Sequence, residues 1–322
     1  MAFTNKENEA LQIAVIGSGT VGPGIAATLA ARFSGKILMH DINPVILHSG
    51  AATARSSLRE VLEKVEDLHP DDIQTKVEKI VAVSFEEACK HSAFIFEAVS
   101  ENLELKQKVF EELGKLCPHS TIFCSNTSSL SITDIASSMA YPERAVAAHF
   151  VYPAHLMPLV EICGGKKTHP STIEKVYKFL KEMGKQPIKI SKEIPGFICA
   201  RLQAALLREC LNIYNSGIAS VEDVDLAVTQ SFGRRLNTMG PFAVADTVGI
   251  DLLRYTHATL FASLDNSTMD PLCEKMAQEG KLGMKTNQGF YNWTELEKKK
   301  LLDKRDSALR HDLKTDLPNA IE

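Results

Sequence analysis

The sequence predicts an α/β fold in which a doubly wound, mainly parallel sheet is followed by an all-helical C-terminal domain. Short apolar runs alternate with helical patterns through the first part of the chain, an order typical of parallel sheets covered by helices. Beyond the breaker pair Pro195-Gly196, strand signals nearly vanish and helical periodicity remains. We therefore expect two domains, residues 1–194 and 195–322.

The expected strands of the first domain are short apolar runs bounded by glycines or polar turns. They cover residues 11–16, 36–39, 81–83, 93–99, 121–124 and 145–149. Helical patterns cover residues 24–33, 103–116 and 44–79, the last interrupted by a turn at 69–72. Within 44–79, the spacing i, i+3, i+4, i+7 predicts an apolar face. This face consists of Leu58, Val61, Leu62 and Val65.

The second domain is expected to contain helices at residues 201–214, 221–229 and 252–264. Residues 295–304 are a run of charges, which is typical of a solvent-exposed surface.

The overall composition favours a cytoplasmic protein that binds neither nucleic acid nor membranes. The net charge is −4, and basic and aromatic residues are not interleaved. The seven cysteines form no C-x-x-C pair, as expected for reduced thiols. Neither a signal peptide nor an apolar run of the ~20 residues needed to span a membrane is visible.

A glycine-rich segment, Gly17-Ser18-Gly19-Thr20-Val21-Gly22, predicts a Rossmann-type dinucleotide site. It stands between an expected strand and an expected helix. Gly17 permits a tight turn, Gly19 lets the backbone approach a pyrophosphate, and Gly22 permits close helix packing. The N–H groups at the helix start attract phosphates, so we expect Thr20 and Val21 to lie against the cofactor as well.

Asp41 follows the second strand, 19 residues beyond Gly22, where an acidic residue binds the adenosine ribose. Its charge would repel a 2′-phosphate, and Ile42 and Asn43 supply no arginine, so we expect NAD rather than NADP. The alternative is an ordinary glycine-rich turn. The strand, helix and acidic residue together favour the cofactor.

His149 and Glu161 are candidates for acid/base catalysis. Oxidation of an alcohol requires removal of the hydroxyl proton, and histidine suits this because its pKa lies near neutrality. A carboxylate would orient the imidazole and stabilise its protonated form. From spacing alone, a buried structural histidine is an equally good interpretation. The segment Ser125-Asn126-Thr127-Ser128-Ser129 either faces the cofactor or caps a helix.

Other chemistries fit the sequence poorly. It contains no G-x-S-x-G, no H-E-x-x-H and no Cys/His set with zinc spacing. We therefore predict no metal site.

Several longer motifs together resemble the short-chain L-3-hydroxyacyl-CoA dehydrogenase family, from about Ile13 to Tyr291. These motifs are Phe96-Glu97-Ala98-Val99-Ser100-Glu101-Asn102-Leu103, Ser125-Asn126-Thr127-Ser128-Ser129-Leu130, His149-Phe150, Leu159-Val160-Glu161, Pro195-Gly196-Phe197, Met239-Gly240-Pro241-Phe242, Asp246, Gly249, Gly283-Met284-Lys285-Thr286 and Gly289-Phe290-Tyr291. The resemblance implies NAD-dependent interconversion of an L-3-hydroxyacyl-CoA and its 3-oxo form, by a homodimer that pairs through its helical domain.

The resemblance also implies roles for single residues. His149 is similar to the general acid/base of the family, Glu161 to its partner, and Ser128 to the serine that contacts the substrate oxygen. The positions associated with the cofactor are Glu101, Lys106 and Lys285. The positions that contact the CoA portion are Ser57 and Lys64.

Two departures from the family pattern bear on the substrate. Tyr152 and Ala200 stand where the family usually has asparagine, so we expect Tyr152 to reshape the substrate pocket. The acidic residues Glu60, Glu63, Glu66 and Asp67 near Lys64 also oppose CoA binding. The chain is similar to the lambda-crystallin, L-gulonate 3-dehydrogenase and carnitine dehydrogenase relatives too. A small free hydroxy acid is therefore an alternative substrate, and a non-catalytic dinucleotide-binding protein is a further alternative.

Overall fold

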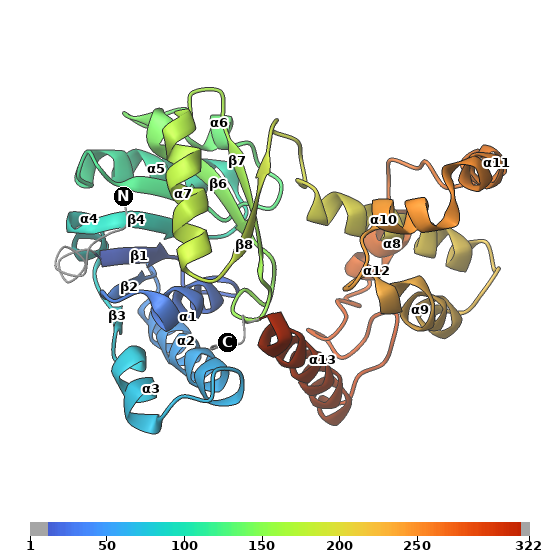
Figure 1. The fold of residues 1–322 in the computed structure, drawn as a ribbon, viewed down its shortest axis with the longest axis horizontal. Coiled ribbons are helices and arrows are strands. Elements are labelled where there is room, and N and C mark those ends of the chain that lie inside the picture. The colour runs from blue at the N-terminus through green and yellow to red at the C-terminus, as the bar shows by residue number, and fades with distance from the viewer. Residues whose placement is uncertain (1–11, 317–322) are drawn as a thin grey trace. The chain divides into compact units, whose positions relative to one another are not determined.

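A twisted eight-stranded sheet forms the centre of the first of two units in the computed structural model, which describes residues 12–316 (Figure 1). Its strand order is β3-β2-β1-β4-β5-β6-β7-β8. The strands are β1 (Gln12–Ile16), β2 (Ile37–His40), β3 (Ile80–Ala82), β4 (Ser92–Glu97), β5 (Ile122–Ser125), β6 (Ala145–Phe150), β7 (Leu159–Gly164) and β8 (Gln186–Ile190). The predicted doubly wound, mainly parallel sheet is confirmed.

Helices cover both faces of this sheet. They are α1 (Gly22–Arg32), α2 (Pro44–Lys64), α3 (Pro70–Val77), α4 (Phe85–Lys90), α5 (Leu103–Leu116), α6 (Ile132–Ile135), the 3-10 helix η1 (Pro142–Arg144) and α7 (Pro170–Glu182). Successive residues of a strand point to opposite faces. Ile13 and Val15 accordingly pack with α1, α2 and α7, whereas Ala14 and Ile16 pack with α4, α5 and α6. Residues predicted as one apolar face, Leu58, Val61, Leu62 and Val65, are all buried.

Strand β7 is the exception to the parallel order, because it runs antiparallel to β6. A parallel neighbour would need a long crossover connection, and the link between the two strands spans only residues 151–158. Neither this reversal nor α7 and β8 were predicted from the sequence. Strand β8 pairs with β7 in parallel and closes the sheet.

A buried lysine, Lys185, fixes the β6–β7 link through hydrogen bonds to two of its carbonyl groups. Lys185 Nζ donates to the carbonyl oxygens of Ala154 at 2.7 Å and Met157 at 2.9 Å. Thr28 Oγ1 also donates to Ala154 O, at 3.1 Å. Burial lowers the pKa of Lys185 to about 7. A neutral amine still has two N–H bonds, so both carbonyls keep their donor after deprotonation.

The second unit comprises Cys199–Leu302. Its helices are α8 (Cys199–Asn215), α9 (Val221–Gln230), η2 (Phe232–Arg235), α10 (Pro241–Val248), α11 (Ile250–Leu260), α12 (Pro271–Gln278) and the start of α13 (Glu295–Asp316). From Asp303 onward the chain belongs to the first unit. The structure therefore differs here from the sequence-based division at residue 194, because α13 packs Leu309 and Leu313 against that unit.

The predicted charge run at 295–304 is the first part of α13. Across residues 12–316, no helix combines the length and the apolar character needed to cross a membrane.

The buried Lys185 predicts a pH-dependent stability. Between pH 7 and about 10, the unfolded chain keeps a proton on Lys185 that the folded chain has released, so the folded state gains stability as pH rises. Relative to Lys185→Met, the wild type should gain on the order of 1 kcal/mol per pH unit in this window. Urea unfolding of both proteins at several pH values measures this difference. A difference that does not change with pH would contradict the prediction.

Candidate active site

The turn between β1 and α1 brings two glycines into contact with backbone and leaves a third exposed. Gly17 has φ +103°, and a Cβ there would lie 2.5 Å from the carbonyl oxygen of Ala98. A Cβ on Gly22 would collide with the carbonyl oxygen of Gly17, whereas a Cβ on Gly19 would meet nothing within 4 Å. The first two glycines are therefore required by the fold, and Gly19 leaves its side of the loop open to a ligand.

Asp41 is fixed beside this loop by two backbone groups. Its Oδ2 accepts a hydrogen bond from Ser18 N at 2.8 Å, and its Oδ1 accepts one from Asn43 N at 2.9 Å. A carboxylate has about four acceptor sites, so both oxygens can still accept from hydroxyl groups. The predicted ribose-binding carboxylate is thus held in place next to the glycine turn.

A groove of about 900 Å³ crosses the carboxyl ends of the parallel strands. The predicted cofactor and catalytic residues that line it are Gly17, Gly19, Thr20, Val21, Asp41, Glu101 and Ser128. Ligands of doubly wound sheets bind at this edge. The open backbone at Gly19 and the fixed Asp41 fit a dinucleotide, so these residues would hold NAD.

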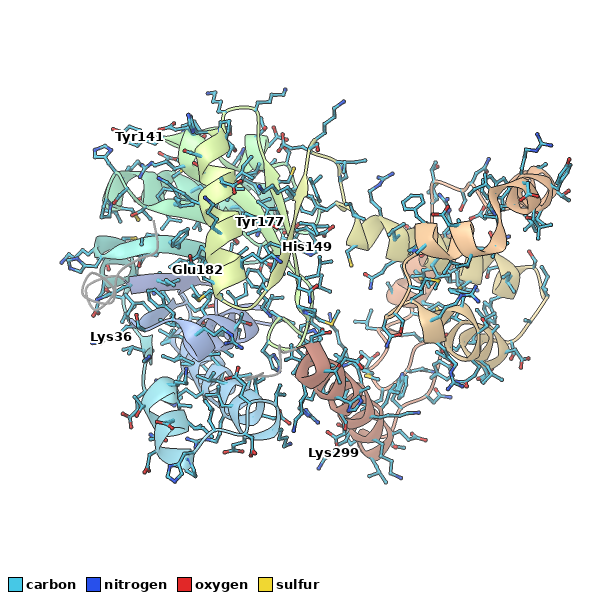
Figure 2. All side chains as sticks on the ribbon, viewed as in Figure 1. Lys36, Tyr141, His149, Tyr177, Glu182 and Lys299 are labelled. Carbon is cyan, nitrogen blue, oxygen red and sulfur yellow. The ribbon has the colours of Figure 1, made fainter. Side chains whose placement is uncertain are left out.

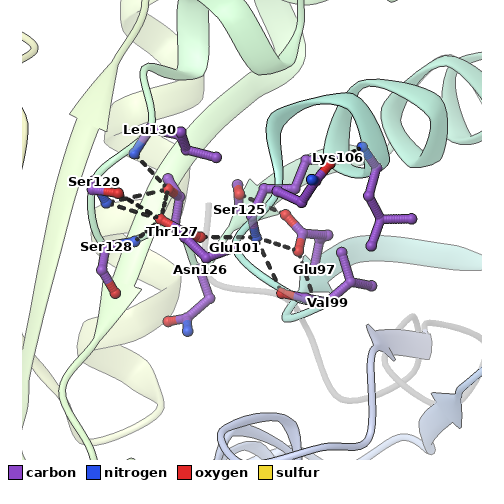
Figure 3. A network of polar contacts seen from close by, with 12 residues as sticks. Glu97, Val99, Glu101, Lys106, Ser125, Asn126, Thr127, Ser128, Ser129 and Leu130 are labelled. Carbon is purple, nitrogen blue, oxygen red and sulfur yellow. Dashed lines mark hydrogen bonds and ion pairs between the residues drawn. The ribbon is translucent and has the colours of Figure 1, made fainter. Parts of the chain in front are cut away.

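A buried ion pair supports the floor of the groove (Figure 3). Glu97 and Lys106 are both fully buried, and Glu97 Oε1 lies 2.7 Å from Lys106 Nζ. The carboxylate also accepts hydrogen bonds from Val99 N at 2.8 Å and Ser125 Oγ at 2.6 Å. Burying a charge is costly unless it is paired and hydrogen-bonded, and Glu97 meets both conditions.

Sequence reasoning assigned no role to Glu97, which appeared only within a family motif. An acidic residue ending an apolar strand was the available signal. Lys106 was predicted to contact the cofactor, but it is fully buried and is not part of the groove lining. Its Nζ lies 3.4 Å from Oε2 of Glu101, which does line the groove.

Glu101 connects this ion pair to the serine-rich segment. Its Oε1 accepts hydrogen bonds from Thr127 Oγ1 at 2.7 Å and from the backbone N–H groups of Ser128 and Ser129, each at 3.0 Å. Burial opposes ionisation of Glu101, but these donors and the charge of Lys106 outweigh it and lower the pKa of the carboxyl. Glu101 therefore stays ionised and fixes the backbone of Ser128.

His149 and Glu161 are register partners across the antiparallel strands β6 and β7. Figure 2 labels His149 on the sheet of the first unit. His149 Nδ1 lies 2.8 Å from Glu161 Oε2, and His149 Nε2 lies 3.2 Å from Ser128 Oγ. Glu161 is fully buried, and its other oxygen accepts a hydrogen bond from Ile198 N at 2.8 Å. The carboxylate favours a proton on Nδ1, which leaves Nε2 as the basic nitrogen beside the serine hydroxyl.

Asn126 also ties the strands together at this edge. Its side-chain oxygen accepts a hydrogen bond from Phe150 N at 2.7 Å, which links the end of β5 to the end of β6. Sequence reasoning quoted Asn126 within the serine-rich segment without giving it a role.

Comparison with known proteins places this geometry in a family. The family model described as 3-hydroxyacyl-CoA dehydrogenase, NAD binding domain, matches residues 12–194, and the model of the C-terminal domain matches residues 196–293. The chain belongs to the 3-hydroxyacyl-CoA dehydrogenase family. It is an NAD-dependent oxidoreductase of that type.

Relatives within the family differ in their substrates. The chain is 34% identical over 293 residues to 3-hydroxybutyryl-CoA dehydrogenase of Clostridioides difficile, covering 88% of this chain and 99% of the relative. It is 32% identical over 302 residues to 5-formyl-3-hydroxy-2-methylpyridine 4-carboxylate 5-dehydrogenase of Mesorhizobium japonicum, covering 92% and 95%. A crystal structure of an enzyme with the latter activity has a TM-score of 0.86 and 29% identity, covering 93% of this chain and 96% of that one.

Besides His149, Glu161 and Lys106, four further positions predicted to contact substrate or cofactor are not part of the groove lining. Lys64, at the end of α2, is exposed and its Nζ lies 2.8 Å from Glu60 Oε1. Ser57 is half-buried on the same helix, and Tyr152 is 55% exposed after β6. Lys285 is exposed and belongs to the second unit. Contacts of these residues with substrate or cofactor remain predictions.

The glycine turn gives a paired prediction for cofactor binding. Gly22→Ala should lower the melting temperature and abolish NADH binding, because the new methyl group collides with the backbone of Gly17. Gly19→Ala should fold like the wild type but bind NADH more weakly, because its methyl group enters the groove. Thermal unfolding and NADH fluorescence titration measure the two effects. Equal loss of stability in both variants would contradict this assignment of the two glycines.

Proposed function

We propose that the protein interconverts the hydroxyl and ketone forms of a 3-hydroxyacyl compound, with His149 as the general acid/base. The observation that carries this proposal is the position of His149 Nε2 beside Ser128 Oγ, at a groove that suits NAD. NAD, when bound, supplies the hydride acceptor. His149 takes the hydroxyl proton of the substrate at Nε2, and Glu161 stabilises the resulting imidazolium.

Ser128 would orient the reacting oxygen in this reaction. Its hydroxyl lies 3.2 Å from His149 Nε2, so a substrate oxygen placed beside this pair would contact both groups. The backbone of Ser128 is held by Glu101, which keeps this position defined before the substrate arrives. Such pre-organisation lowers the entropic barrier of the reaction.

Two substrate classes suit this reaction. Membership of the family and the C. difficile relative support an L-3-hydroxyacyl-CoA. A small free hydroxy acid is the second candidate. It is favoured by the pairing of Lys64 with Glu60 and by similarity to a dehydrogenase named for a free pyridine carboxylate. Oxidation of NADH with acetoacetyl-CoA, acetoacetate and 3-dehydro-L-gulonate separates the two classes.

The acid/base role predicts a specific defect. His149→Gln should lower kcat by about 10²–10⁴-fold on whichever substrate the wild type accepts, while NADH affinity stays unchanged. His91→Gln, which alters an exposed histidine, is the matched control and should retain full activity. Steady-state kinetics and NADH titration measure both properties. Wild-type turnover by His149→Gln would remove this residue from the mechanism.

We also propose that the protein is a homodimer that pairs through its second unit. No residue of Cys199–Leu302 is buried in the single chain, so this unit lacks a core of its own. Large apolar side chains are exposed along it, among them Phe242 at 89% and Tyr255 at 67%. Exposed large apolar side chains in a unit without buried residues are typical of an interface, and a second copy would supply a matching surface.

The dimer proposal predicts a particle of twice the 35.4 kDa chain mass in light scattering after size exclusion. Phe242→Asp should shift this particle towards the monomer, because it places a charge in the apolar surface. Lys304→Ala, which alters an exposed lysine of the first unit, should leave the mass unchanged. A wild type that is monomeric at all concentrations would overturn the proposal.

A further inference from the structure

The final part of α13 packs along α2 within the first unit. Leu309 and Leu313 contact a small cluster formed by Val61 and Val65 of α2 and Leu156 of the β6–β7 link. All three residues of this cluster are buried. Leu309 and Leu313 are themselves partly buried, so each contributes less than the roughly 1.5–3 kcal/mol of a fully buried side chain, and together they place α13 as a cover over the second half of α2.

An ion pair strengthens the same attachment. Arg310 Nη1 lies 2.8 Å from Glu60 Oε1, and the Arg310 side chain is only 16% exposed. The same carboxylate oxygen lies 2.8 Å from Lys64 Nζ. Glu60 is therefore shared by both cations, and the exposed ammonium group of Lys64 has a carboxylate partner on its own helix.

The remaining charges of this region oppose an anionic ligand. Glu63, Glu66 and Asp67 follow in the sequence, and the nearby Arg32 is paired with Glu66 at 3.3 Å. A CoA arm carries several phosphate charges, and phosphates bind where cations are available for them. On this side of α2, α13 covers the apolar surface, and Lys64 and Arg32 each have a carboxylate neighbour that offsets their charge towards an anionic ligand.

A third contact brings α13 to the segment that follows the catalytic strand. The Arg305 guanidinium lies 5.6 Å from the centre of the Tyr152 ring, a cation–π distance. Asp306 Oδ1 lies 2.7 Å from Arg305 Nη2 and fixes this arginine. Tyr152 is three residues beyond His149, so α13 contacts both α2 and the chain leaving the active site.

The match to the C-terminal family model ends at residue 293, and α13 begins at Glu295. We propose that α13 is a specificity element that closes the α2 side of the site to a CoA arm, so that the substrate is a small free hydroxy acid. This inference rests on the hydroxyl–ketone reaction proposed above. It selects the second of the two substrate classes from contacts made by this chain itself.

The test compares CoA binding in variants that loosen α13. Free CoA is titrated into the NADH-bound protein by calorimetry, which does not depend on turnover. The wild type should show no CoA binding. Arg310→Glu, which places like charges beside Glu60, and Leu309→Asp should each raise the affinity for CoA at least about tenfold. Lys304→Ala, on the exposed side of α13, is the control and should behave like the wild type.

Hydrogen exchange at Val61 and Val65 verifies that the helix has loosened while the fold persists. Arg310→Lys should restore the wild-type behaviour, which guards against a variant that has merely misfolded. Saturable CoA binding to the wild type, or unchanged affinity in loosened variants, would overturn the proposal. Failure of the proposed hydroxyl–ketone reaction has a different signature. In that case no substrate supports NADH oxidation, but the affinity for CoA still rises in the loosened variants.

Discussion

The fully buried carboxylate of Glu161 governs the geometry of the active site. An ionised carboxyl group away from water needs a charged or hydrogen-bonding partner for each oxygen. His149 and the backbone of Ile198 provide these partners. The imidazole is thereby held with Nε2 towards Ser128. The antiparallel register of β6 and β7 places His149 directly opposite Glu161, so the reversal in the sheet supplies the pairing on which the proposed acid/base geometry rests.

Glu97 is a second fully buried carboxylate, next to the predicted cofactor groove, and it too is held by charged and hydrogen-bonding partners. Its ion pair with Lys106 is surrounded by donors from β4 and β5, and Lys106 extends the network to Glu101. The result is a rigid polar layer beneath the groove, running from the end of β4 to Ser128. Removing either member of such a pair leaves an uncompensated buried charge. The position of Ser128 therefore depends on Glu97 and Lys106, which do not touch it.

The sequence predicted those features that local pattern determines. Apolar runs identified six strands of the sheet, and the spacing of glycines and Asp41 identified the dinucleotide turn. Strand β8 was missed because Gln186, Pro187 and Lys189 break its apolar character. The burial of Lys106 was missed because it depends on the packing of α5 against β4 in three dimensions. The pairing of Lys64 with Glu60 has the i,i+4 spacing of a local helix pair, so the sequence already contained its signal. The attachment of α13 to α2 was not predicted, because the charge run at 295–304 indicated an exposed segment and Leu309 and Leu313 lie beyond it.

The path of the chain through the two units also affects how the protein is made. The first unit is discontinuous, since it includes residues up to Ile198 and those from Asp303. On the ribosome, the sheet emerges well before α13. Val61 and Val65 stay uncovered until the last segment has been synthesised. Chains with exposed apolar surface are prone to aggregation, so translation of residues 198–303 is an interval in which the nascent chain carries an uncovered apolar surface on α2.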